Sequence, residues 1–124
     1  MAPTGGTTNV SVSIVPKGTG AFSLAVPDGT ATGGNVRGAN AVDLQTDRSS
    51  ATQVASGTKS VAIGARNTAG NSGVAIGNTV TAGNGGIAIG SAIVTAGGSN
   101  SIAIGSTALS AGNSSAIAIG TNCA

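Results

Sequence analysis

One short phrase recurs along the second half of the chain and restricts its fold more than any other feature. The segments SVAIG, GVAIG, GIAIG, SIAIG and AIAIG end at Gly64, Gly77, Gly90, Gly105 and Gly120, at intervals of 13 or 15 residues. A fixed period of this length, with one short strand per unit, is typical of a solenoid, because a single unit cannot bury its apolar face without neighbours. The sequence therefore predicts an all-β chain wound into a parallel β-roll.

The two faces of each predicted strand differ in kind, because side chains alternate between the faces of a strand. One face carries large β-branched residues, which we assign to the interior of the roll: Val61, Ile63, Val74, Ile76, Ile87, Ile89, Ile102, Ile104, Ile117 and Ile119. The other face always carries alanine and never a polar residue. We therefore expect it to meet another copy of the chain, at Ala62, Ala75, Ala88, Ala103 and Ala118.

The composition favours an assembled protein over a free monomer. Aromatic residues make up 1% of the chain and charged residues 6%, against roughly 25% charged residues in a typical globular protein. All eight charged residues lie between Lys17 and Arg66, so the rest of the repeat region has no charge to keep it soluble. The net charge of +2 is too small to favour nucleic acid. The longest apolar run, Ala116 to Ile119, is far too short to insert into a membrane, and the first residues do not read as a signal peptide.

The side chains that enzymes use are scarce. The chain has no His, Glu or Tyr, so we expect no enzyme and predict no catalytic, metal-binding or cofactor-binding residues. Asp43 and Asp47 are compatible with a carboxylate pair or metal site, but we favour solvated surface or salt bridges to Arg37 and Arg48. The glycine-rich segment 33–39 lacks the lysine and hydroxyl of a phosphate-binding loop and is interpreted as a turn. A calcium β-roll needs an aspartate in each repeat, and these repeats have none.

The N-terminal region departs from the repeat. The segment Gly38 to Gln45 aligns with Gly57 to Gly64 and is interpreted as a degenerate repeat. Before it, NVSVSIV and AFSLAV alternate in polarity and are separated by turn-forming residues, so we expect two strands that cap or anchor the rod, with a hairpin as one arrangement. We place the domain boundary between an attachment region, residues 1–35, and the β-roll, residues 36–124. Cys123 is interpreted as a small apolar filler, with an interchain thiol as the alternative.

The repeated pattern A-G-x-x-S-x-A-I-G resembles the head repeats of trimeric autotransporter adhesins of the YadA type. The resemblance covers Ala55 to Ala124, slightly over half of the chain. It implies a homotrimer of left-handed parallel β-rolls, with apolar strand residues inside each roll and small residues toward the trimer axis.

The passage IVPKGTGAFSLAVPDGTATGGNVRGANAVDLQT is similar to segments of tailed-bacteriophage fibre and spike proteins. This resemblance implies a structural protein at the virion surface: a short spike, head or tail fibre, or capsid decoration protein, attached to other capsid or tail proteins through its N-terminal region. A tail position would add contact with a host surface receptor. The alternative is the adhesive head of a bacterial trimeric autotransporter, located at the cell surface.

Overall fold

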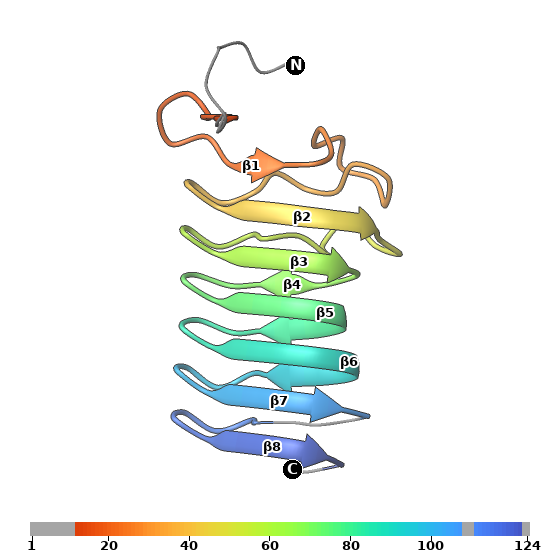
Figure 1. Cartoon of the computed structure of the whole chain (residues 1–124), viewed down its shortest axis with the longest axis vertical. Coiled ribbons are helices and arrows are strands. Elements are labelled where there is room, and N and C mark those ends of the chain that lie inside the picture. The colour runs from red at the N-terminus through yellow and green to blue at the C-terminus, as the bar shows by residue number, and fades with distance from the viewer. Residues whose placement is uncertain (1–11, 108–110, 123–124) are drawn as a thin grey trace, which may run out of the picture.

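The repeats stack into a parallel β-solenoid of about five turns (Figure 1). The structure is a computed structural model that describes residues 12–107 and 111–122. Its strands are β1 (Phe22–Ser23), β2 (Val42–Asp47), β3 (Val61–Ala65), β4 (Thr68–Ala69), β5 (Val74–Ala82), β6 (Ile87–Ala96), β7 (Ile102–Ser106) and β8 (Ile117–Thr121). They form one sheet in the order β1-β2-β3-β5-β6-β7-β8, and β4 pairs with β5. The predicted all-β, parallel solenoid is confirmed.

Equivalent residues of successive turns lie directly beside one another in the sheet. Val61 pairs with Val74 and Ile63 with Ile76, and the same register continues to β8. The degenerate repeat also takes its predicted place, because Val42 pairs with Val61. One sequence repeat is therefore one turn of the solenoid.

The repeated glycine marks a point where adjacent turns lie too close for a side chain. At Gly77, φ is +136°, and a Cβ atom there would collide with the carbonyl oxygen of Gly90 in the next turn. Corners elsewhere in the turn use non-glycine residues in the left-handed region, such as Ser72 and Thr79, with φ of 53° and 59°. The phrase ends in glycine because the stacking leaves no other choice at that position.

Alanine fills the interior, so our assignment of the two faces was wrong. Ala62, Ala75, Ala88 and Ala103 are completely buried, and Ala118 is 8% exposed. They belong to one core with residues of the opposite wall: Ala55, Ala69, Val80, Ala82, Val94, Ala96 and Ala111. The alanines therefore pack against the far wall of the same turn, whereas we expected them to meet another copy of the chain. A turn of this length encloses so narrow a space that rows of alanine with an occasional valine fill it, and isoleucine is left outside.

The N-terminal region joins the sheet in a different way from the one expected. Among the described residues of this region, only β1 is a strand, and it pairs parallel to β2, so no hairpin forms there. Phe22 lies beside Val42 and therefore heads the same column of outward side chains as the repeats. The segment 9–11 lies outside the described residues, and residues 12–15 of the same predicted strand are exposed coil.

Candidate functional surface

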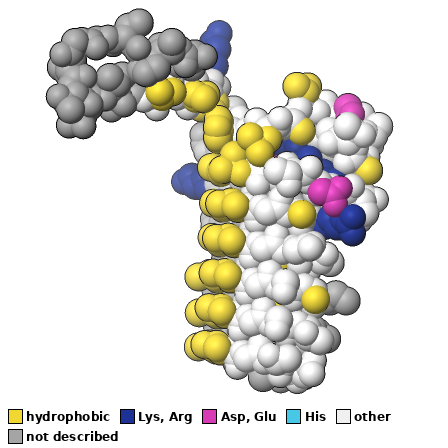
Figure 2. All heavy atoms as spheres, turned by 45° about the vertical axis from the view of Figure 1, so that its right-hand side comes forward, with side chains coloured by type: hydrophobic (Ala, Val, Ile, Leu, Met, Phe, Trp, Pro, Cys, Tyr) yellow, Lys and Arg dark blue, Asp and Glu magenta, His cyan; other side chains and the backbone are white. Residues whose placement is uncertain are grey.

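The large aliphatic residues form two continuous rows on the outside of the solenoid. Figure 2 shows them as stacked apolar side chains along one face of the rod. The rows contain all ten residues predicted to form the interior: Val61, Ile63, Val74, Ile76, Ile87, Ile89, Ile102, Ile104, Ile117 and Ile119. Most are half-buried by their neighbours above and below, while Ile117 and Ile119 in the last turn are 67% and 65% exposed. We call this surface the aliphatic ladder.

The ladder extends beyond the regular repeats toward the N-terminal end. Val42 and Leu44 add a pair from β2, and Phe22 stands above Val42. Single exposed apolar residues are ordinary on protein surfaces, but a contiguous apolar patch marks a site of interaction. A flat strip of uncharged β-branched side chains can pack against another apolar surface, and removal of both surfaces from water is favourable. It offers nothing for proton transfer or ion binding.

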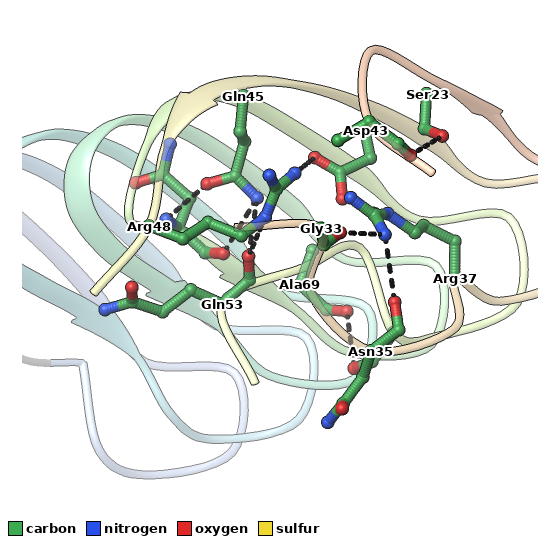
Figure 3. A network of polar contacts seen from close by, with 12 residues as sticks. Ser23, Gly33, Asn35, Arg37, Asp43, Gln45, Arg48, Gln53 and Ala69 are labelled. Carbon is green, nitrogen blue, oxygen red and sulfur yellow. Dashed lines mark hydrogen bonds and ion pairs between the residues drawn. The ribbon is translucent and has the colours of Figure 1, made fainter. Parts of the chain in front are cut away.

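A buried ion cluster fills the first turn (Figure 3). The carboxylate of Asp43 accepts a hydrogen bond from Arg37 Nε at 2.7 Å and from Arg48 Nη2 at 3.0 Å. All three side chains are at most 2% exposed. Arg37 Nη1 also donates to the carbonyl oxygens of Gly33 and Asn35. The favoured salt bridges of Asp43 to Arg37 and Arg48 are confirmed, and they tie the excursions before and after β2 into the first turn.

Two buried amides extend this polar interior into the second turn. Gln45 Nε2 donates to the carbonyl oxygens of Gln53 and Asn67, and Gln45 Oε1 accepts from the Asn67 amide. The Asn67 side chain then donates to the carbonyl oxygens of Ile63 and Gly77 and accepts from the Val80 amide. The amides thus satisfy backbone groups where the regular pairing is interrupted. We did not predict this pair, since nothing in the local sequence distinguishes Asn67 from the nine other asparagines of the chain or connects it with Gln45.

The remaining acidic residues lie at the surface. Asp47 pairs with Arg66 at 2.7 Å in an exposed ion pair, and not with Arg37 or Arg48. Asp28 accepts hydrogen bonds from the backbone amide and hydroxyl of Thr30 and from the amide of Gly33. The Thr30 amide, with its hydroxyl next, lowers the pKa of Asp28 below its ordinary value. Among residues 12–107 and 111–122, His, Cys, Asp and Glu form no group able to hold a metal ion.

The structure also bears on the predictions made for the segment 33–39, for Cys123 and for membrane insertion. The segment 33–39, predicted to be a turn, is one only at its ends: turns cover residues 31–33 and 39–40, and residues 36–38 are coil that leads into the first turn of the solenoid. Cys123 lies outside the described residues, and Val80 and Val94 are buried in the interior. In the part of the chain that the structure describes, no helix is long and apolar enough to cross a membrane.

The fold defines the class of protein: a parallel β-solenoid with an aliphatic ladder on its outer face. No family model matches the chain, and searches of curated proteins and of solved structures found no match.

Proposed function

We propose that this chain is a non-enzymatic structural protein of a phage virion, a short homotrimeric spike, fibre or capsid decoration protein. The observation that carries the proposal is the aliphatic ladder, which runs the length of the solenoid on its outer face. A free monomer would hold this strip in water, and burying it against other copies is favourable by roughly 25 cal/mol for each Å² of apolar surface.

The ladder supports association of copies side by side, about an axis parallel to the solenoid. Each turn contributes the same two aliphatic positions. When copies lie side by side, the aliphatic pair of each turn therefore contacts the aliphatic pair of the matching turn in its neighbour. The absence of charge after Arg66 removes like-charge repulsion between copies. The number three and the left-handed winding follow from the resemblance to YadA-type heads. With this assignment the ladder, and not the alanine face, is turned toward the trimer axis.

The N-terminal region is the proposed attachment to other virion proteins. It exposes several large apolar residues outside the regular turns: Val12, Ile14, Val15, Leu24, Val26 and Val36. Buried against a capsid or tail protein, they would supply the apolar centre of an interface. The projecting repeat rod would then decorate the particle, or contact a host receptor if the protein belongs to the tail.

Cryo-electron microscopy of the particle that carries this protein tests the proposal. Trimeric density at capsid symmetry axes would support a decoration protein or head spike, and density at the tail would support a fibre component. Absence from every particle would overturn the virion proposal. Recovery of the trimer from an outer membrane would then favour the adhesin head at the bacterial surface.

A further inference from the structure

Asn84 and Gly85 form the corner that leads into β6, and they are the only Asn-Gly pair in the sequence. Such a pair can react with itself in water. The backbone nitrogen of Gly85 loses its proton and attacks the side-chain amide carbon of Asn84, ammonia leaves, and a cyclic imide forms. Glycine favours the attack, because it has no side chain to crowd the nitrogen or to restrict the backbone. Asn84 is exposed, so water can reach the imide and hydrolyse it.

The stacked fold holds both reacting groups against one residue of the preceding turn. The Gly85 amide donates a hydrogen bond to the carbonyl oxygen of Asn71 at 2.8 Å, and Asn84 Oδ1 accepts one from the Asn71 amide at 3.1 Å. The Asn84 carbonyl oxygen accepts from the Asn100 amide of the following turn at 3.0 Å. A hydrogen-bonded amide gives up its proton only when the local structure opens, as in hydrogen exchange. The stacking of three turns therefore protects the reactive pair.

The corner one turn earlier has the same hydrogen bonds but a less reactive sequence. Asn71 Oδ1 accepts from the Thr58 amide, and the Ser72 amide donates to the Thr58 carbonyl oxygen, both at 2.9 Å. The second residue of each corner is left-handed, with φ of 53° at Ser72 and 65° at Gly85. The residue after asparagine is thus the main difference, and the serine side chain hinders attack by its own backbone nitrogen. The earlier corner is therefore an internal reference for Asn84.

We propose that Asn84–Gly85 is a site of spontaneous modification that reacts only when adjacent turns of the solenoid separate. Water is the only co-reactant. Formation of the imide breaks the bond from Asn84 Cγ to its side-chain nitrogen and releases ammonia. Addition of water to either imide carbonyl then opens the ring and gives aspartate or isoaspartate at position 84. No bound group takes part, and nothing is oxidised or reduced.

The two products differ in whether the turn can close again. Aspartate keeps the length of the main chain, and its carboxylate can accept the hydrogen bond from the Asn71 amide in the place of Asn84 Oδ1. Isoaspartate directs the main chain through Cβ and adds one backbone atom before Gly85. Ile87 then no longer stands in register with Val74 of β5. Isoaspartate thus converts a transient opening into a permanent defect in the middle of the rod and of its aliphatic ladder.

Timed incubation of the full-length protein at neutral pH tests the site. The references are a capped peptide of residues 80–89 and the same protein unfolded in guanidinium. Mass spectrometry with electron-transfer fragmentation locates each modified residue and distinguishes isoaspartate from aspartate. Asn84 should react at least about tenfold more slowly in the folded protein than in the peptide, in parallel with the protection of the Gly85 amide from hydrogen exchange. In the unfolded protein, Asn84 should react faster than Asn71.

Two variants at position 84 separate the reaction from its consequence. Asn84→Ser places there the residue that Ser99 provides at the equivalent corner of the next turn, and it should abolish the modification while β-structure is retained. Asn84→Asp is the aspartate product made directly, and it should retain protection of the Gly85 and Asn100 amides. The purified isoaspartate form should lose that protection and melt at a lower temperature than Asn84→Asp.

Several outcomes would overturn the proposal. They are equal rates at Asn84 in the folded protein and the peptide, no reaction at Asn84 after unfolding, faster reaction at Asn71 than at Asn84 in the unfolded chain, or full amide protection in the isoaspartate form. The reaction needs only the single chain and water, so a monomeric parent protein would contradict the proposed trimer and leave the modification site intact.

Discussion

The first turn of the solenoid and the turns that follow share a backbone course but fill their interiors by opposite means. Around β2, the interior position beside Ala62 is occupied by Asp43, held between two arginines. From β3 onward the same column consists of alanine alone. Specific ion pairs fill the first turn. Methyl groups of alanine and valine fill most of the later turns, with the Asn67 amide in the second turn.

The feature common to both regions is the outer face. Val42 and Leu44 keep the ladder intact across a turn whose interior has changed completely. The interior thus needs only to be filled, whereas the outer rows are maintained through every turn from β2 to β8. This contrast favours the ladder, and not the interior, as the surface on which function depends.

The largest expected effect separates the two kinds of interior. Asp43→Asn leaves two buried arginines without a carboxylate and should lower the free energy of unfolding by about 3–5 kcal/mol. Asp47→Asn removes a carboxylate from an exposed ion pair and should cost less than about 1 kcal/mol. Guanidinium denaturation of both variants measures the difference. Similar small losses would mean that the cluster does not hold the first turn.

Enlarging an interior alanine tests the methyl-packed turns. Ala88→Leu forces a larger side chain into a space without room for it and should lower the free energy of unfolding by about 1–3 kcal/mol. Thr81→Leu, at an exposed position of the preceding turn, should leave the denaturation midpoint nearly unchanged. A stable, folded Ala88→Leu protein that fails only to assemble would show that alanine faces another copy after all.

The close approach of adjacent turns can be tested by adding one methyl group. Gly77→Ala places a Cβ against the Gly90 carbonyl and forces alanine to adopt φ of +136°, which should cost about 1–3 kcal/mol. Gly97→Ala meets only the Thr95 side chain at 3.4 Å and has no positive φ, so thermal unfolding should separate the two variants. Equal melting temperatures would contradict the tight stacking.

The smallest expected effect is a local response to acid in the turn before the first solenoid turn. The pKa of Asp28 is lowered on folding, so its contribution to stability is present above its ordinary value of 3.8 and is lost as the pH falls through the folded value. The protection of the Thr30 and Gly33 amides from hydrogen exchange, relative to the intrinsic exchange rate at each pH, should therefore decrease only in acid. Asp28→Asn should abolish that pH dependence, and an unchanged acid response in the variant would assign it elsewhere.

The repeat spacing was sufficient to predict the solenoid, its parallel strands and the degenerate first repeat. Alternation also predicted correctly that alanine and the β-branched residues lie on opposite faces. It could not say which face is inside, because that depends on the distance between the two walls of a turn. The usual rule that large apolar residues are buried then gave the wrong answer for residues such as Ile76 and Ile89, since alanine and an occasional valine already fill the space between the walls.

The buried polar residues were predictable only in part. The charges of Arg37, Asp43 and Arg48 suggested pairing because they lie close in sequence. The link between Gln45 and Asn67 spans 22 residues and depends on the stacking of two turns. Nor does the sequence indicate that Arg37 Nη2 lacks a hydrogen-bond partner among the described residues, because this depends on the three-dimensional geometry of the cluster.

The most direct test of the central claim is the mass of the protein in solution and its dependence on the ladder. Sedimentation velocity at micromolar concentration should give a trimer for the parent chain and for Thr81→Asp. Ile89→Asp, on the outer ladder, should give a folded monomer, with its β-structure verified by circular dichroism. A monomeric parent chain, or an Ile89→Asp protein that remains trimeric, would contradict the assignment of the aliphatic ladder as the surface of self-association.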